Sequence, residues 1–221
     1  MKTIIFDCDG VLIDSEILYQ EIMIEHMNDH GIFYEKPDFI AKFMGTGSGY
    51  FYEVMAKEHQ KKFERPLPEN FTPSLKARLR SEFKIRLQAV SGISDLLSSM
   101  DQIMAVASSS ENDFLHDKLK QTELHAYFRD HIYSADFVEQ AKPFPDLFLY
   151  TADKLNVAPS ECIVIEDSEN GVKAGLAAGM HVIGFCGGLH SDEAYGQKLK
   201  QTGAHQIAMN ATDLSEMLKA A

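Results

Sequence analysis

Residues 3–14 read TIIFDCDGVLID, and the rest of the chain is organised around this stretch. Thr3–Phe6 is an apolar run rich in β-branched side chains, which predicts a short strand buried on both faces. Asp7 and Asp9 follow it directly, and Gly10 lets the backbone turn sharply. Two carboxylates beside an apolar strand cost free energy unless a cation or hydrogen bonds compensate them. Taken alone, the pattern is better explained by turn residues or helix caps, with a carboxylate site as the alternative.

The composition sets limits on the class of protein. The chain has 221 residues, of which 45% are hydrophobic, enough for one core domain and a small appendage. A net charge of −12 argues against a nucleic-acid partner. No stretch approaches the ~18 apolar residues of a membrane span, and the first strand leaves no room for a signal peptide. Three cysteines, in or beside predicted strands, are expected to be buried reduced thiols: Cys8, Cys162 and Cys186. We therefore expect a cytoplasmic monomer without a membrane partner.

The first third of the chain, after the opening strand, has the periodicity of helices. Four helices are predicted, at Ser15–His30, Pro37–Phe43, Tyr50–Lys62 and Pro73–Leu87. Between the second and third lies a glycine-rich stretch, Met44–Gly49. Its spacing is G-x-G-x-G and no strand precedes it, so we expect a connecting loop rather than a nucleotide cradle.

The remainder of the chain alternates short apolar runs with helix-length segments. Strands are predicted at Ile103–Ala107, Ile132–Tyr133, Cys162–Ile165, His181–Phe185 and Gln206–Met209. This alternation predicts an α/β fold, a doubly wound parallel sheet with helices on both faces. Residues 1–14 and 88–221 would form this core domain. Residues 15–87 would be an all-helical insertion after the first strand.

Two features of the helical region allow a functional interpretation. His26 and His30 lie one turn apart and could hold a metal, but no third ligand is evident nearby, and a solvated helix face explains them more simply. A basic cluster in the fourth predicted helix consists of Lys76, Arg78, Arg80, Lys84 and Arg86. We expect these charges to lie in water. Attraction of an anionic substrate is the alternative.

Four stretches in order resemble the motifs of the haloacid dehalogenase (HAD) superfamily, in its phosphatase and beta-phosphoglucomutase-like branch. They are D-C-D-G-V-L-I-D-S-E from Asp7, Ala107-Ser108-Ser109-Ser110, Lys142-Pro143-Phe144-Pro145-Asp146 and Ile165-Glu166-Asp167-Ser168-Glu169-Asn170-Gly171. The resemblance implies a Rossmann-like core, with residues 15–87 as a helical cap. Because ligands bind beyond the carboxyl ends of parallel strands, the separated motifs would meet in one crevice.

The resemblance also implies catalytic roles. Asp7 would be the nucleophile that attacks phosphorus and forms an aspartyl-phosphate. Asp9 would protonate the leaving alcohol and then accept a proton from the attacking water. Asp9 must therefore start protonated. Crowding by other acids would raise its pKa, and a metal ion would oppose that rise.

A magnesium ion is the implied cofactor, because carboxylates crowded into one crevice repel one another and Mg²⁺ binds a few carboxylates together with substrate phosphate. The implied ligands are a carboxylate oxygen of Asp7, the backbone carbonyl of Asp9, and Asp167. Glu166 would be a direct or an outer-shell ligand. The alternative for Glu166 and Asp167 is a helix N-terminus with acids in its first turn, which is compatible with metal binding.

Phosphate-binding groups are implied by the same motifs. Gly10 lets the backbone approach the ligand closely. The Ser108 hydroxyl would donate to the phosphate, and the amides of Ser109 and Ser110 would open a helix whose N-terminus suits an anion. Without the other motifs, a serine-rich helix cap would be the simpler interpretation. Lys142, held before Pro143, would place a fixed positive charge at the transferring phosphoryl group, although a surface lysine in a proline turn is the alternative.

Departures from the family pattern separate the possible activities. The phosphoglucomutases carry a cap histidine where this chain has Tyr19, and an arginine where it has Ser48. The absence of this histidine and this arginine weakens the mutase interpretation. Asp9 argues against a dehalogenase, because true dehalogenases lack the second acid of the first motif. We therefore expect a Mg²⁺-dependent phosphatase of a small phosphorylated metabolite, such as a sugar phosphate. A sugar phosphomutase is the alternative. A non-catalytic phosphoryl receiver is the rival from another class, but it would need neither Asp9 nor a cap.

Overall fold

The computed structural model of the chain describes residues 2–43 and 48–220. It divides into a core unit, Met1–Glu16 with Leu87–Ala221, and a helical unit, Ile17–Arg86. The core unit is built on a six-stranded parallel sheet with the order β3-β2-β1-β4-β5-β6. The strands are β1 (Thr3–Phe6), β2 (Met104–Ser108), β3 (Ile132–Ser134), β4 (Cys162–Glu166), β5 (His181–Phe185) and β6 (Gln206–Ala208). The predicted α/β parallel sheet is confirmed.

Strand β1 lies at the centre of the sheet, as its apolar sequence predicts. All four of its residues are buried, and Ile4 pairs with Met104 of β2 on one side and Ile163 of β4 on the other. Because every neighbouring pair is parallel, the carboxyl ends of all six strands lie at the same edge. The loops that follow β1, β2 and β4 are therefore neighbours at that edge.

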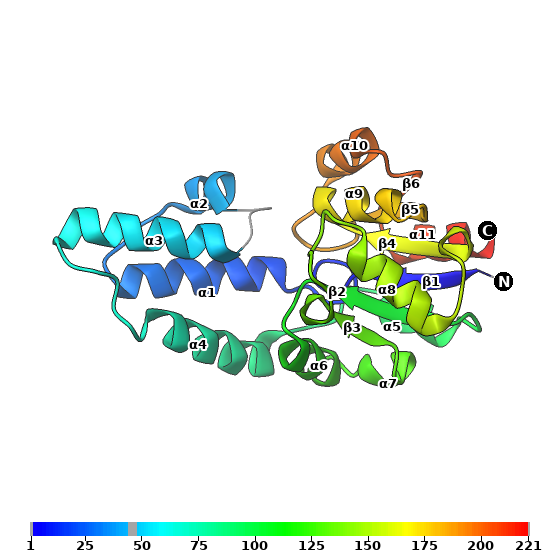
Figure 1. Cartoon of the computed structure of the whole chain (residues 1–221), viewed down its shortest axis with the longest axis horizontal. Helices are drawn as coiled ribbons and strands as arrows, with labels where there is room; N and C mark the ends of the chain where they lie inside the picture. Colours follow the sequence, from blue (N-terminus) through cyan, green and yellow to red (C-terminus); the bar gives the residue numbers. More distant parts are fainter. Residues whose placement is uncertain (1, 44–47, 221) are drawn as a thin grey trace. The chain divides into compact units, whose positions relative to one another are not determined.

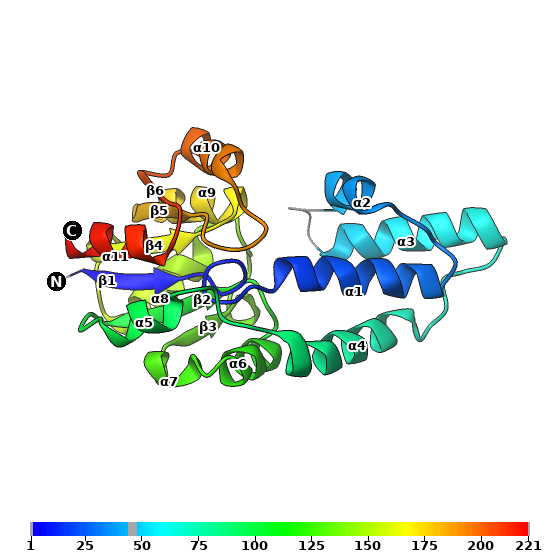
Figure 2. The same cartoon turned by 180° about the vertical axis from the view of Figure 1, so that it is seen from behind.

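Helices pack on both faces of the sheet. Helices α8 and α9 cover one face, and α5 and α11 lie against the other (Figures 1 and 2). The helices of the core unit are α5 (Ile93–Ser98), α6 (Asn112–Gln121), α7 (His125–Phe128), α8 (Asp146–Leu155), α9 (Glu169–Ala177), α10 (Glu193–Thr202) and α11 (Ala211–Lys219), with short 3-10 turns at Ala135–Phe137 and Pro159–Glu161. Apolar side chains of α8 and α9, such as Phe148 and Val172, join Ile5 and Val164 in one buried cluster.

The helical unit contains four described helices. They are α1 (Glu16–Asp29, whose first residue belongs to the core unit), α2 (Lys36–Phe43), α3 (Ser48–Phe63) and α4 (Phe71–Arg86). The predicted apolar stripe of the fourth helix is present, since Leu75, Leu79 and Phe83 are all buried. The glycine-rich stretch singled out in the sequence falls largely on residues 44–47, which lie outside the described residues.

Two surface interpretations of the helical unit need correction. His26 does not lie on a solvated helix face, because it is 4% exposed and its Nε2 lies 3.0 Å from the carbonyl oxygen of Phe71. Nδ1 of His30 lies 2.8 Å from the carbonyl oxygen of His26. Both rings therefore have structural partners within the unit. In the basic cluster, Arg78 donates to Glu25 and Asp29 of α1, so this charge is paired rather than simply hydrated.

The three cysteines are buried and free, as expected. Within residues 2–43 and 48–220, no helix is both long and apolar enough to cross a membrane.

The central position of β1 leads to a stability prediction. Ile5 is fully buried in β1, whereas Ile103, just before β2, is 49% exposed. Ile5→Ala should lower the free energy of unfolding by about 2–5 kcal/mol, because it leaves a cavity beneath the helices. The matched variant Ile103→Ala should cost less than about 1 kcal/mol. Urea unfolding followed by circular dichroism measures both, and equal losses would contradict the central placement of β1.

Candidate active site

Three carboxylates gather at the carboxyl edge of the sheet. Asp7 follows β1, Glu166 is the last residue of β4, and Asp167 follows it. One carboxylate oxygen from each lies within 4.8 Å of the other two. All three residues are buried, with exposed fractions of 7%, 0% and 6%. The motifs quoted from both halves of the sequence thus converge at one point.

Lys142 connects two of these carboxylates. Its Nζ lies 2.5 Å from Oδ1 of Asp7 and 2.6 Å from Oε1 of Glu166, and it donates to the backbone carbonyl of Ala107 at 2.9 Å. Burial disfavours the charged amine, but the two carboxylates outweigh burial and hold the pKa of Lys142 well above its usual value. Lys142 is therefore a fixed positive charge inside the acidic cluster, and not a surface lysine in a turn.

The carboxylate of Glu166 is held by further neighbours. The backbone amide and the hydroxyl of Ser168 donate to its Oε2 at 3.0 and 2.9 Å. Gly171 leaves the space that the carboxylate fills, because a Cβ there would lie 1.8 Å from it. Ser168 is also the N-cap of α9 and accepts from the amide of Gly171. The start of α9 thus fixes Glu166 in place.

The pKa values of the remaining two carboxylates of the cluster are raised. Burial raises the pKa of Asp7 well above its usual value, Lys142 opposes that rise, and Glu166 and Asp167 add to it. Burial likewise raises the pKa of Asp167, with Glu166 and Glu16 adding to the effect. A positive charge placed among these oxygens would lower both pKa values.

The carboxylate of Asp9 has a different set of ion-pair and hydrogen-bond partners. Nζ of Lys118, on α6, lies 2.5 Å from both carboxylate oxygens of Asp9. The hydroxyls of Ser15 and Ser110 donate to the same carboxylate at 2.5 and 2.8 Å. Burial raises the pKa of Asp9, but Lys118 and these hydrogen bonds outweigh burial and hold it below the usual value. The sequence left the net pKa shift of Asp9 open, and in the fold the buried ammonium of Lys118 decides it.

The serines after β2 are arranged differently from the predicted helix start. Ser108 is 1% exposed, and its hydroxyl oxygen accepts from the amide of Ser110 at 3.1 Å. Ser109 is exposed. Helix α6 begins only at Asn112, so the amides of Ser109 and Ser110 do not open a helix as expected. The Ser110 amide donates to the Ser108 hydroxyl oxygen instead.

Asp167 has a partner that the sequence did not indicate. Nε2 of His190 lies 3.0 Å from its Oδ2, and both side chains are at least nine-tenths buried. Gly10, which has a φ of 79°, lies against both of them. A Cβ there would be 1.9 Å from Oδ2 of Asp167 and 2.8 Å from Cε1 of His190. The close approach predicted for Gly10 is thus made to protein side chains in this structure.

Sequence reasoning missed Lys118 and His190 for different reasons. Lys118 lies in the second half of α6, in a helix with an ordinary mixture of charges. It is nevertheless 2% exposed, and only the fold shows that it reaches Asp9. His190 lies in the loop between β5 and α10, outside every quoted motif. Its one sequence signal is the neighbouring pair Gly187-Gly188, which indicates a backbone packed closely against something.

The cluster formed by Asp7, Glu166 and Asp167 fits a hard divalent cation. It offers several carboxylate oxygens at close range on a rigid edge, and Mg²⁺ binds through one or two carboxylates together with water and substrate phosphate. The side chain of Asp9 is occupied by Lys118, so Asp9 could contribute only its backbone carbonyl.

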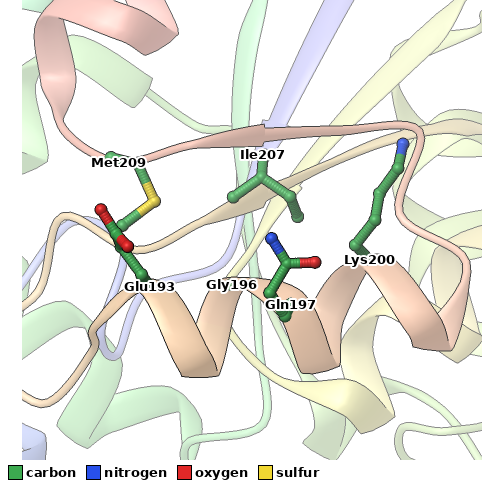
Figure 3. A pocket seen from close by; sticks show the side chains of 6 residues that line it. All are labelled: Glu193, Gly196, Gln197, Lys200, Ile207 and Met209. Carbon is green, nitrogen blue, oxygen red and sulfur yellow. The ribbon is translucent and has the colours of Figure 1, made fainter.

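A separate surface pocket of about 550 Å³ lies between α10 and β6 (Figure 3). Its lining residues are Glu193, Gly196, Gln197, Lys200, Ile207 and Met209. It contains none of the clustered carboxylates, and the acid Glu193 and the base Lys200 lie at its opposite ends (Figure 3). The chemistry described above therefore belongs to the carboxyl edge of the sheet and not to this pocket.

Comparison with known proteins places this geometry in a family. A family model described as haloacid dehalogenase-like hydrolase matches residues 1–179. A 6-phosphogluconate phosphatase of Escherichia coli is 28% identical over 191 residues, covering 86% of this chain and 85% of the relative. A phosphorylated carbohydrates phosphatase of Thermotoga maritima is 31% identical over 209 residues, covering 92% of each. The crystal structure of a HAD family hydrolase from Deinococcus radiodurans, with bound phosphate and sodium, superposes with a TM-score of 0.80 at 28% identity, covering 100% of this chain and 96% of that one.

The pair formed by Lys118 and Asp9 can be tested with matched variants on one helix. Lys118→Met leaves the Asp9 carboxylate without its cation and should lower the free energy of unfolding by about 1–3 kcal/mol at pH 7. Lys120→Met, at an exposed position of the same helix, should leave it nearly unchanged. Urea unfolding at a series of pH values measures both variants.

The pH dependence of that difference has a definite sign. Lys118 lowers the pKa of Asp9 in the folded chain, so its contribution is complete above the ordinary aspartate pKa of about 4. It is lost as the pH falls through the folded-state pKa. The difference in the free energy of unfolding between the wild type and Lys118→Met should therefore become smaller below about pH 4. A gap that widened on acidification would contradict the pairing.

Proposed function

The chain belongs to the haloacid dehalogenase-like hydrolases, and we propose that within this family it is a Mg²⁺-dependent phosphatase of small phosphorylated metabolites. The supporting observation is the placement of Asp7, whose carboxylate lies against Lys142 and beside Glu166 and Asp167 at the carboxyl edge of the sheet. Two of its relatives are named as a 6-phosphogluconate phosphatase and a phosphorylated carbohydrates phosphatase, which supports a sugar phosphate as substrate.

Asp7 acts as the nucleophile in this proposal. Its carboxylate attacks phosphorus, the bond to the leaving oxygen breaks, and the aspartyl-phosphate that forms is then hydrolysed by water. Lys142, already fixed against Asp7, places its ammonium where negative charge develops on the phosphoryl oxygens. In its described hydrogen bond the buried hydroxyl of Ser108 is the acceptor, from the Ser110 amide. Its own proton can therefore be donated to phosphate.

Asp9 transfers the protons in both steps. Its low pKa suits the second step, in which the carboxylate accepts a proton from the attacking water. In the first step it must carry a proton to the leaving alcohol. The negative charge of a bound phosphate ester raises the pKa of a neighbouring carboxyl group, and this favours the protonated form. Lys118, Ser15 and Ser110 hold the carboxylate of Asp9 in place until then.

Magnesium would be held by Asp7, Asp167 and the backbone carbonyl of Asp9, with Glu166 next to them. When bound it supplies positive charge that offsets the clustered carboxylates and the phosphate. The pairing of Glu166 with Lys142 and Ser168 favours an outer-shell role for this residue.

The helical unit, residues 17–86, acts as a cap that selects the substrate in this proposal. The phosphoglucomutases that this chain resembles carry a histidine and an arginine at two positions of the cap. This chain has Tyr19 and Ser48 there. A mutase must hold a doubly phosphorylated intermediate while it reorients, and these replacements remove two cationic groups for that task. Hydrolysis is therefore favoured over phosphomutase activity.

The nucleophile can be tested by Asp7→Asn, with Asp101→Asn at an exposed position as the matched control. Loss of acid–base help alone costs about 10²–10⁴-fold in rate, and loss of the nucleophile should exceed that. Steady-state turnover of p-nitrophenyl phosphate, followed by a panel of sugar phosphates, measures the effect. Retention of more than about one-tenth of the rate, a barrier change below ~1.4 kcal/mol, would exclude Asp7 as nucleophile. Wild-type product that stopped at one equivalent would indicate a phosphoryl receiver.

Metal binding can be tested by stability as well as by activity. Mg²⁺ at 100 times its dissociation constant should add about 2.7 kcal/mol to the free energy of unfolding if it binds only the folded chain. Asp167→Asn should reduce this gain, whereas Glu169→Gln, at an exposed position two residues further on, should not. Thermal melts with Mg²⁺ and with EDTA measure the shift. A midpoint indifferent to Mg²⁺, with hydrolysis that survives EDTA, would refute the metal.

A further inference from the structure

His190 is a buried histidine outside the motifs on which the proposed function rests. Its side chain is 7% exposed, and its Nε2 lies 3.0 Å from Oδ2 of Asp167. The hydroxyl of Ser191 lies 3.0 Å from the same nitrogen. The other ring nitrogen, Nδ1, is buried without a hydrogen-bond partner among the described residues. Every described polar contact of the imidazole is thus made through Nε2.

The position of the ring is fixed by backbone on two sides. A Cβ at Gly10 would lie 2.8 Å from Cε1 of His190, and one at Gly188 would lie 2.9 Å from Cε1 and from Nδ1. The loop is also anchored to the segment after β1, because the amide of Leu189 donates to Asp14 at 2.8 Å. The amide of Ser191 closes the turn on the carbonyl of Gly188. The conformation of the loop therefore holds the His190 ring in contact with Asp167.

The proton of the ring is assigned by its neighbours. With the proton on Nε2, the ring donates to a carboxylate, which is the stronger kind of hydrogen bond. With the proton on Nδ1, a buried donor would have no acceptor, and the Nε2 lone pair would face the oxygen of Asp167. The first arrangement is favoured on both counts. The Nε2 proton thus lies on the side of Asp167.

We propose that His190 is a positioning residue for Asp167 and thereby sets the affinity of the site for Mg²⁺. The donated hydrogen bond occupies Oδ2 and fixes the orientation of the carboxylate, which leaves its other oxygen for the ion. Without it, the carboxylate can turn away from Glu166 and Asp7, because like charges repel in a buried cluster. Partners of this outer-shell kind are typically worth about 10–100-fold in metal affinity.

This inference rests on the proposed magnesium site, and the experiment separates the two. Mg²⁺ is titrated calorimetrically into substrate-free protein, and thermal midpoints in excess EDTA report whether each variant is folded. His190→Asn removes the donor at the Nε2 position, whereas His190→Gln places an amide N–H near it. Ser191→Ala removes the other neighbour of Nε2 and is the matched control. His190→Met, whose side chain is of similar length and has no N–H, is the second variant without a donor at the Nε2 position, for the case in which His190→Asn does not fold.

The expected result is a dissociation constant raised about 10–100-fold in His190→Asn or His190→Met, with most of the affinity recovered in His190→Gln. Ser191→Ala should bind Mg²⁺ as the wild type does. A donor-less variant that binds within about twofold of the wild type, on a scale where tenfold is 1.4 kcal/mol, would overturn the inference. The inference would also be overturned if His190→Gln lost as much Mg²⁺ affinity as His190→Asn. The loss would then come from changed packing and not from the missing hydrogen bond. Wild-type protein that does not bind Mg²⁺ would instead refute the proposed metal site itself.

Discussion

The ion pairs of Lys142 are the interactions on which the site depends. One ammonium contacts both Asp7 and Glu166 in a region where all three side chains are at least nine-tenths buried. Buried carboxylates at this spacing cannot remain charged together without compensation. Lys142 supplies that compensation from a loop far away in the sequence, and its link to the carbonyl of Ala107 fixes it to the end of β2. The pairing thus requires β1, β2 and β4 to end side by side.

The topology meets that requirement directly. With β1 in the centre and β2 and β4 on either side, three loops leave one edge within reach of a single side chain. Two glycines then remove the side chains that would fill the space. Gly171 makes room for Glu166, and Gly10 makes room for Asp167 and His190. Substitution at either position would disturb the carboxylates rather than the sheet. The fold and the charge arrangement are therefore fixed by the same few residues.

The sequence predicted what local pattern can predict. Apolar runs predict all six strands, and the apolar, β-branched sequence of β1 predicts the burial that all four of its residues show. Asp7, Glu166 and Asp167 stand at strand ends in quoted motifs, so their convergence followed from parallel pairing. Other features depend on tertiary distance, which no local pattern shows. The pairing of Lys118 with Asp9, which sets the direction of the Asp9 pKa shift, is one of them. The start of α6 was misplaced because the serines hydrogen-bond with one another before the helix begins.

The charges around the site connect metal binding with proton release. Five carboxylates influence one another electrostatically, from Asp7, Asp9, Glu16, Glu166 and Asp167, and among the described residues Lys118 and Lys142 supply the positive charges paired with them. Burial and mutual repulsion raise the pKa values of Asp7 and Asp167, so keeping both carboxylates ionised costs free energy. The proposed Mg²⁺ would lower that cost, because metal ligands bind in their ionised form. A bound ion would thereby also favour the ionised form of Asp7, which is the form that a nucleophile needs.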